Sequence, residues 1–567
     1  MVSKSKNAQS LYVIKSFYKN GVRTSKIIEK LGTYDELLVK LDGRDPIEWA
    51  QKYINELNIK EKEEKRETLI KYYPTKQIPK GEQRSFNGGY IFLQKIYHEL
   101  GLHKICKDIS RKYKFTFDLD SVLSRLVYSR IIFPSSKLAT FELSKRFIEQ
   151  PNFDLHHIYR ALEVISKESD AIQSALYNNS IKVCNRNKRI LYYDCTNYFF
   201  EIEQEEGLKQ YGYSKEHRPN PIVQMGLFMD GDGLPLAFNI SKGNTNEQVT
   251  LKPLEQKIIA DFDISKFVVC TDAGLASTDN RKFNDIGSRA FITTQSIKKL
   301  KSHLKKWALD TENWHLSGSN KIFSIKDLDP KKDLEKVFFK ERWIKENGLE
   351  QNLIVTFSLK YQLYQQTIRS RQVERAQKLI DTNPTKLKKS NPNDYKRFIA
   401  KTSCTKDGEI AEHQLFSIDS DLVSQECIYD GFYGVCTNLE NEAESIIKIN
   451  KRRWEIEESF RILKTEFKAR PVYLQRDDRI QAHFTTCFIS LMLYRILEKK
   501  LDDQFTCEEI TSGLKDMSFY EIPKEGYIPT YTRSDFTDAL HDTFGLRTDY
   551  QIISEKNMKK IFKTTKV

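Results

Sequence analysis

The sequence lacks the features that mark secreted, zinc-binding or membrane-spanning chains. Its nine cysteines are odd in number and scattered, and no two have CxxC spacing, which argues against a disulfide framework and a zinc ribbon. The first residues, MVSKSKNAQSLYVIK, contain no apolar run typical of a signal peptide. The most apolar helical stretch, 484–497, is too short to span a bilayer and contains Arg495. We therefore expect a reducing, cytoplasmic compartment and no membrane partner.

The composition is that of a folded, basic protein. With 567 residues and 39% hydrophobic side chains, the chain can bury several cores, and its length suggests about three to five structural units. Lys and Arg number 92 against 78 Asp and Glu, which gives a formal charge of +14. Such a surplus favours a polyanionic partner, most commonly nucleic acid. A protein that is merely basic would carry the same charge, so charge alone leaves both interpretations open.

The N-terminal third is charged and mostly helical in pattern. Residues 10–33 predict two short strands, and 45–72 predict a charged helix or linker. Residues 88–184 have helical periodicity and are rich in basic side chains. These are Arg125, Arg130, Lys137, Lys145, Arg146 and Arg160. An ordinary helical bundle with a charged surface would look similar, but we favour a DNA-binding region.

From residue 189 the pattern changes to strands. RILYYDCTNYFFEI reads as a central strand, and IVQMGLFMD-GDG-LPLAFNIS as a β-hairpin. A helix, a strand, a short helix and a strand follow, up to residue 294. This is the element order of a ribonuclease-H-like core that lacks only its final helix. The sequence therefore predicts an α/β fold.

The missing helix comes after a long interval. Residues 295–445 are too many for a loop, so we expect an inserted domain of mixed character, with several strands and one basic helix at 361–380. Helices are then predicted at 443–467 and 478–499. The expected divisions are an N-terminal segment, a helical region, the first part of the core, the insertion, the rest of the core and a C-terminal region. Their bounds are 1–80, 81–185, 186–295, 296–442, 443–500 and 501–567.

Two aspartates occupy positions suited to metal binding. Asp194 lies inside an apolar strand, where an acid costs free energy unless it is paired or binds a metal. Asp272 ends the strand FVVCT, and the carboxyl ends of such strands are common ligand sites. The alternatives are a solvent-facing aspartate on an edge strand and an aspartate that caps the next turn. Phosphodiester transfer with two metal ions needs carboxylates gathered on rigid elements.

A third candidate lies in the predicted helix at 443–467. Ile456, Phe460, Leu463 and Phe467 form an apolar stripe at helical spacing. The neighbouring face carries Arg453, Glu457, Arg461, Lys464 and Lys468. An ordinary solvated face with ion pairs would explain Glu457 taken alone. Together with the two aspartates in the expected elements, the metal-binding interpretation is favoured, with Mg²⁺ or Mn²⁺ as the ion.

The chain resembles DDE transposases of the insertion-sequence-4 superfamily, in particular the insertion sequence 1634 branch, over roughly residues 80–500. That superfamily has the motif Y-x2-R-x3-E-x6-K, and Arg453, Glu457 and Lys464 have its spacing. Asn450 stands at the tyrosine position, which puts that one DNA contact in doubt. The similar segments are RIIFPSSK, YYDCTN, RPNPIVQMGLFMDGDGLPLAF, KGNTNE, VVCTDAG, RWEIEESFRILKTEF and RPVY.

The resemblance implies a metal-dependent transposase, and it implies that the insertion at 296–442 is mainly β. Asp194 would ligate two Mg²⁺ or Mn²⁺ ions, and Asp272 and Glu457 would each ligate one. Arg453 and Lys464 would hold phosphates of double-stranded DNA, namely the terminal inverted repeats and the target. A homodimer in the DNA complex and a bacterial, nucleoid-associated location are further expectations. Three more candidate DNA contacts are Arg461, Arg218 and Trp454, although a tryptophan in such a helix is more often part of the core.

Two other functions remain open at this point. A related metal-dependent nuclease would cut DNA without strand transfer and would not bind paired inverted repeats. An inactive or host-adopted descendant would only bind DNA, and the presence of all three acids disfavours it. Short inverted repeats flanking the coding region would favour a cut-and-paste transposase.

Overall fold

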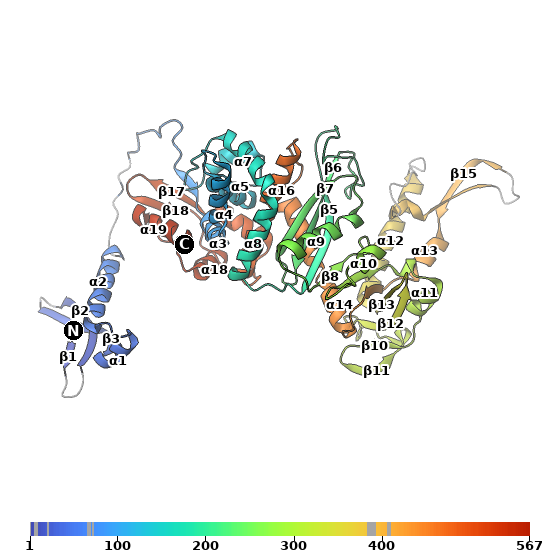
Figure 1. The fold of residues 1–567 in the computed structure, drawn as a ribbon, viewed down its shortest axis with the longest axis horizontal. Coiled ribbons are helices and arrows are strands. Elements are labelled where there is room, and N and C mark those ends of the chain that lie inside the picture. Colours follow the sequence, from blue (N-terminus) through green and yellow to red (C-terminus); the bar gives the residue numbers. More distant parts are fainter. Residues whose placement is uncertain are drawn as a thin grey trace. The chain divides into compact units, whose positions relative to one another are not determined.

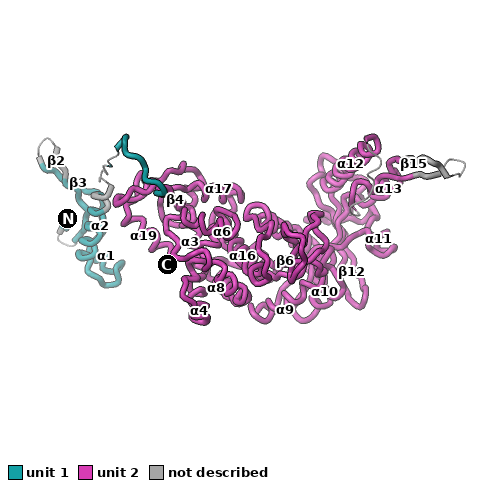
Figure 2. Tube along the Cα trace, turned by 90° about the horizontal axis from the view of Figure 1, so that it is seen from above, with its two compact units in different colours: residues 1–82 teal, residues 83–567 magenta. Residues whose placement is uncertain are grey.

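The computed structural model describes residues 2–4, 9–19, 22–64, 70, 73–382, 393–404 and 410–567. The chain divides into two compact units, residues 1–82 and 83–567 (Figure 2). The first unit is small and the second contains all the candidate site residues.

The first unit is an antiparallel sheet followed by two helices. Its elements are β1 (Val2–Lys4), β2 (Gln9–Lys19), β3 (Val22–Thr33), α1 (Tyr34–Lys40) and α2 (Pro46–Glu64). β2 and β3 are 11 and 12 residues long, so they are longer than the short strands that the sequence predicts. Thr33 and Glu36 form a reciprocal capping box that starts α1. The predicted charged helix is present as α2, and 65–69 and 71–72 lie outside the described residues.

A ten-stranded mixed sheet dominates the second unit, and with its flanking helices it confirms the α/β fold (Figure 1). The strand order is β11-β10-β12-β13-β16-β9-β8-β5-β6-β7. β5 and β6 pair antiparallel, as do β6 and β7, whereas β5–β8 and β8–β9 are parallel. This half comprises β5 (Ile190–Phe199), β6 (Ile222–Asp230), β7 (Pro235–Lys242), α9 (Leu251–Asp261), β8 (Val268–Thr271), α10 (Thr278–Phe283) and β9 (Ala290–Gln295).

The inserted strands continue this same sheet. β16 (Phe432–Thr437) pairs with β9, and β13 (Leu349–Phe357) pairs with β16. The rest of the interval comprises α11 (Ser302–Leu309), β10 (Trp314–Leu316), β11 (Ser319–Phe323), β12 (Phe338–Glu346), α12 (Leu359–Thr382), β14 (Ile399–Cys404), β15 (Ile410–Ile418) and α13 (Ser420–Cys427). Backbone pairing between β9 and β16 thus joins residues far apart in sequence.

The predicted continuous helix at 443–467 is wrong. The chain forms α14 (Ala443–Lys451), turns at Arg452 and Arg453, and resumes as α15 (Trp454–Arg461), which passes into a π-helical segment (Ile462–Glu466). The predicted apolar stripe from Ile456 to Phe467 is nevertheless buried. Apolar spacing therefore fixed which face packs, although it did not reveal the turn.

The helical region packs with these helices in one core. Its elements are β4 (Ser85–Asn87), α3 (Tyr90–Glu99), α4 (Leu102–Tyr113), α5 (Leu119–Ile132), α6 (Lys137–Ser144), α7 (Leu155–Lys167) and α8 (Ser169–Val183). α16 (Asp477–Lys500) runs against α5 and α7, and its residues share a core cluster with theirs. By length and composition α16 could cross a membrane, but 94% of its apolar window is buried inside the protein.

Three of the basic residues in this region do not lie on the surface. Arg125, Arg130 and Lys137 are buried, at 7%, 4% and 5% exposure. The Nη2 of Arg125 donates to the Glu149 carbonyl at 2.8 Å, so this guanidinium is used within the fold. These three side chains, Arg125 and Arg130 of α5 and Lys137 at the start of α6, therefore do not form an exposed basic surface.

The C-terminal residues return to the start of the second unit. Strands β17 (Ser518–Ile522), β18 (Gly526–Pro529) and β19 (Ile553–Ser554) form a four-stranded sheet with β4. Three helices, α17 (Cys507–Asp516), α18 (Asp535–Phe544) and α19 (Glu555–Thr565), accompany it. Residues 83–87 are thereby tied to the last fifty residues of the chain.

Candidate active site and metal centre

Strand register brings Asp194 and Asp272 side by side. β5 and β8 are parallel neighbours, and Tyr192 is paired with Cys270. Two residues further along each chain stand Asp194 and Asp272. Because side chains alternate across a sheet, Asp194 shares a face with Tyr192, which packs towards α14 and donates to the Ile449 carbonyl at 3.0 Å. Both aspartates therefore lie on the side of the sheet covered by α14 and α15.

The Asp194 carboxylate has little to neutralise it. Its Oδ1 accepts from the Cys195 backbone N–H at 2.7 Å. Burial, with a contribution from the nearby Asp272 charge, raises the pKa of Asp194 to about 6, although Lys215 and Arg453 oppose the shift. Those two cations form their ion pairs elsewhere, with Glu247 at 3.0 Å and with Glu457 at 2.8 Å. A partly buried acid that has no ion pair in the described part of the chain is a favourable ligand for a metal ion.

Glu457 approaches from α15 but is held by an arginine. Its carboxylate is 55% exposed and pairs with Arg453 one turn earlier. Arg453 also lies near enough to Asp194 and Asp272 for both charges to raise its pKa. In the described part of the chain, two groups of three ligand side chains lie within 4.8 Å of one another, and neither includes Asp194, Asp272 or Glu457. Glu457 thus lies on the same side of the sheet as the two aspartates. Its carboxylate, however, forms the i,i+4 ion pair that is typical of an ordinary solvated helix face.

The donor set suits a hard divalent cation. Asp194, Asp272 and Glu457 offer only carboxylate oxygens, which Mg²⁺ and Mn²⁺ prefer. The two aspartates come from adjacent strands of the sheet, and Asp194 has no ion pair among the residues that the structure describes. The chemistry of the residues present therefore fits such a metal, although Glu457 is paired with Arg453.

Lys464, Trp454 and Arg218 are three of the predicted DNA contacts. Lys464 lies beside the cluster: its Nζ donates to Thr196 Oγ1 at 2.6 Å, and burial lowers its pKa to about 8. Trp454, expected more often in a core, is 56% exposed. Arg218 is half exposed and covers the ring of Phe199 at 4.1 Å.

Arg461 is a further predicted DNA contact. It pairs with Glu458 and Glu466, at 3.5 Å and 3.3 Å. Its charge is thus used within this part of the chain.

A cavity of about 650 Å³ opens beside Glu457 and is here called the Tyr433 cavity. Arg453, Trp454 and Glu457 line it on one side and strands β13 and β16 on the other. Asn450, at the motif's tyrosine position, is buried, and its Nδ2 donates to the Tyr433 hydroxyl at 3.3 Å. A tyrosine from the inserted β16 therefore stands next to the position where the motif lacks one.

Sequence reasoning missed several groups around the aspartates. Lys215, from the loop after β5, donates to the Cys195 carbonyl and pairs with Glu247. Glu216, its neighbour, lies 3.7 Å from the Lys464 Nζ and also pairs with Arg470. Glu247 ends the segment KGNTNE, which the resemblance includes, but neither spacing nor periodicity indicates that it meets this loop.

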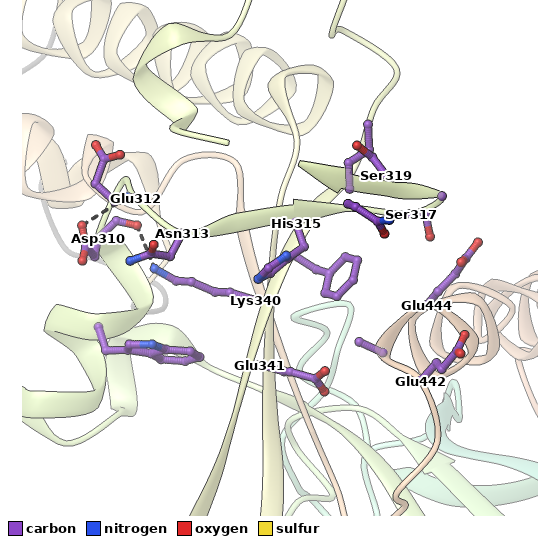
Figure 3. A pocket seen from close by; sticks show the side chains of 16 residues that line it. Asp310, Glu312, Asn313, His315, Ser317, Ser319, Lys340, Glu341, Glu442 and Glu444 are labelled. Carbon is purple, nitrogen blue, oxygen red and sulfur yellow. Dashed lines mark hydrogen bonds between the residues drawn. The ribbon is translucent and has the colours of Figure 1, made fainter. Parts of the chain in front are cut away.

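Another cavity, of about 560 Å³, lies on the insertion and is here called the acidic cavity (Figure 3). It contains none of the predicted site residues. Five carboxylates line it: Asp310, Glu312, Glu341, Glu442 and Glu444. Its cation Lys340 is turned inward and donates to the Asp310 carbonyl at 2.8 Å, so the cavity is unsuited to a nucleic-acid backbone.

A known protein family matches the part of the chain that contains Asp272 and Glu457. Residues 199–493, more than half of the chain, match the family described as the transposase DDE domain. Asp272 and Glu457 lie inside the matched residues, and Asp194 lies five residues before them. A solved structure, the cryo-EM structure of a piggyBac transposase synaptic complex with hairpin DNA, is similar at a TM-score of 0.35 and 8% identity, over 84% of this chain and 90% of that one. No curated protein matches the chain.

Proposed function

The chain belongs to the transposase DDE domain family, and on that premise we propose that it is a cut-and-paste transposase that binds the terminal inverted repeats of its own element, cleaves DNA there and joins the freed ends to a target. Members of such a family are DNA-cleaving and strand-transferring enzymes that use divalent metal ions. The insertion sequence 1634 branch is part of the proposal, on the motifs quoted above.

The pairing of Asp194 and Asp272 carries this proposal. Two aspartates on neighbouring parallel strands lie on the side of the sheet that α15 covers, and Asp194 forms no ion pair with any residue that the structure describes. Asp194 would hold both metal ions, with Asp272 and Glu457 each holding one. When bound, two such ions activate a water or hydroxyl nucleophile and stabilise the leaving oxygen.

The strand arrangement supports a ribonuclease-H-like core. Its first three strands, β5, β6 and β7, form an antiparallel meander, and β8 and β9 add in parallel on the other side of β5. The catalytic helix would be α15, reached after the insertion. The insertion interrupts the core between β9 and α14. Its last strand, β16, pairs directly with β9 and so lies beside the proposed site.

The cations around the cluster have distinct tasks in this proposal. Lys464 and Arg218 lie near β5 and would hold phosphates of the bound strand. Arg453 would exchange its Glu457 partner for a DNA phosphate, which frees Glu457 for the metal. Trp454, exposed in the Tyr433 cavity, would stack on a base near the cut. Arg461 is the weakest of the proposed contacts, because its charge is already paired twice.

Two further features are proposals on the same basis. Two element ends must be held together for joining, so the working complex would be a homodimer. The protein would act in the bacterial cytoplasm, on the nucleoid.

A cleavage and strand-transfer assay tests the function. Purified protein receives DNA carrying the inverted repeats that flank its gene, with Mg²⁺ or Mn²⁺, beside Asp194→Ala and Glu457→Gln. We expect the wild type to cut and join, and both variants to bind without cutting. Cutting by the variants at the wild-type rate would refute the metal ligands. Cutting without joining would indicate a nuclease, and binding without cutting by the wild type would indicate a DNA-binding descendant.

A further inference from the structure

A second charged site lies beyond the end of β5, and the proposed chemistry does not use it. It is a cavity of about 530 Å³, here called the basic cavity. Four cations line it, and its lining contains no aspartate or glutamate. They are Arg130, Lys137, Lys468 and Arg470. This composition is the opposite of that of the acidic cavity.

Lys137 is the strongest indication of a ligand. It is 5% exposed, and no group in the described part of the chain accepts a hydrogen bond from it or pairs with it. Burial and the nearby Arg130 charge lower its pKa to about 7. A buried ammonium without an acceptor is costly, and a bound anion would remove that cost.

Apart from Arg470, whose charge is balanced by Glu216, the neighbouring groups leave the cavity positive. Arg130 is 4% exposed, and among the described residues it donates only to neutral carbonyls, those of Phe467 at 3.0 Å, Lys468 at 3.4 Å and Ser135 at 3.3 Å. Its Nε has no partner in the described part of the chain. His483, which also faces the cavity, is kept neutral because burial lowers its pKa well below the usual value.

A helix end adds to this positive potential. α6 begins at Lys137, and the first backbone N–H groups of a helix have no partner within it. Ser136 caps the helix by accepting from the Ala139 N–H at 3.3 Å. Helix N-termini favour anions, and phosphate is a common one. The helix end and the unpartnered Lys137 ammonium are therefore two independent features that favour the same ligand charge.

The basic cavity is connected to the active site. Arg470 pairs with Glu216, which lies 3.7 Å from Lys464 beside the aspartates. The backbone N–H of Val472, on the cavity wall, donates to the Phe199 carbonyl at the end of β5 at 3.1 Å. Asp194 lies five residues earlier on that strand, or about 17 Å at about 3.3 Å per residue.

We propose that the basic cavity binds a phosphate group of the DNA strand that leads away from the cleavage site. The proposal rests on the proposed function for the source of that phosphate. Measured along a duplex axis, at about 3.4 Å per base-pair step, the distance from Asp194 to the end of β5 corresponds to about five base pairs. The lining includes residues of two segments that lie apart in the sequence, RIIFPSSK (130–137) and RPVY (470–473). These two segments would form opposite walls of one phosphate site.

The test compares Lys137→Met with the wild type and with Lys107→Met, a control that removes an exposed lysine of α4. Binding to a mixed-sequence DNA duplex is measured by fluorescence anisotropy over a range of salt concentrations. We expect Lys137→Met to bind about tenfold more weakly and to have a salt slope lower by about one, as for the loss of one phosphate contact. Equal affinity and slope in Lys137→Met and the wild type would overturn the proposal.

Inorganic phosphate separates this site from the proposed function. At matched ionic strength, phosphate should raise the Tm of the wild type and of Lys107→Met, but not that of Lys137→Met. That result in a protein that cuts no DNA would keep the phosphate site and reject the transposase activity. Cutting by the wild type, with identical phosphate and DNA responses in Lys137→Met, would reject the site and keep the activity. Lys137→Gln, which is polar but uncharged, should behave like Lys137→Met, and a wild-type response in it would also count against the site.

Discussion

The Asp194–Asp272 cluster lies on β5 and at the end of β8, and the basic cavity lies beyond the end of β5. Each contains a charged side chain, Asp194 or Lys137, that forms no ion pair in the described part of the chain, and the two charges are opposite in sign. In the first, burial raises the pKa of an acid, and in the second it lowers the pKa of a lysine. Each charge is disfavoured by its surroundings and would be stabilised by a ligand of the other sign. Buried charges that the fold leaves unpaired therefore indicate ligands more directly than the many paired charges on the surface.

Asp194→Asn should give the largest effect. The variant keeps the shape of the side chain but loses the metal ligand, so we expect DNA cleavage to fall by at least about 100-fold. Mg²⁺ or Mn²⁺ should raise the Tm of the wild type and leave that of the variant unchanged. Asp261→Asn, at the exposed end of α9, is the matched control. An equal metal response in Asp194→Asn would place the metal elsewhere.

Trp454→Ala should separate activity from stability. Because Trp454 is 56% exposed, its loss should change the free energy of unfolding by less than about 0.5 kcal/mol. Loss of one base-stacking contact should still weaken DNA binding by about 1–3 kcal/mol. Chemical denaturation and DNA-binding titrations measure the two quantities. A variant with unchanged DNA affinity would remove Trp454 from the DNA interface.

Lys137→Met should alter the pH dependence of stability. With a folded-state pKa of about 7 against an ordinary 10.5, the folded wild type binds fewer protons than the unfolded chain between these values, so its stability rises with pH there. We expect this rise to contribute about 2 kcal/mol between pH 7 and pH 9 and to be absent in Lys137→Met. Urea denaturation at both pH values measures it. A parallel rise in the variant would show that another group is responsible.

Arg453→Met should have the smallest and most selective effect. Removal of the Arg453–Glu457 pair, worth about 0.2–1 kcal/mol when exposed, should tighten Mg²⁺ binding to the free protein by up to about fivefold. DNA cleavage should nevertheless fall, because a proposed phosphate contact is lost. Calorimetric Mg²⁺ titration and the cleavage assay test both parts. Weaker Mg²⁺ binding in the variant would mean that Arg453 does not compete with the metal.

Much of the fold followed from local pattern. Alternation of apolar residues predicted β5 and the β6–β7 hairpin, and helical spacing predicted the buried face from Ile456 to Phe467. The turn at Arg452 and Arg453 was missed because the apolar residues of α14 and α15 continue nearly the same helical spacing across it. The burial of Arg125 and Arg130 was also missed, since a basic residue in a helical pattern is exposed unless a partner helix such as α16 covers it.

The sequence by itself determined the α/β class, the family and the chemical character of the candidate site, because those depend on residue identity and short-range spacing. Only the tertiary structure decided that Asp194 stands beside Asp272, that Tyr433 meets Asn450 and that Lys137 lines a cavity with Arg470. These contacts join residues tens to hundreds of positions apart. Their geometry depends on strand pairing and on packing across the whole core, which no local pattern encodes.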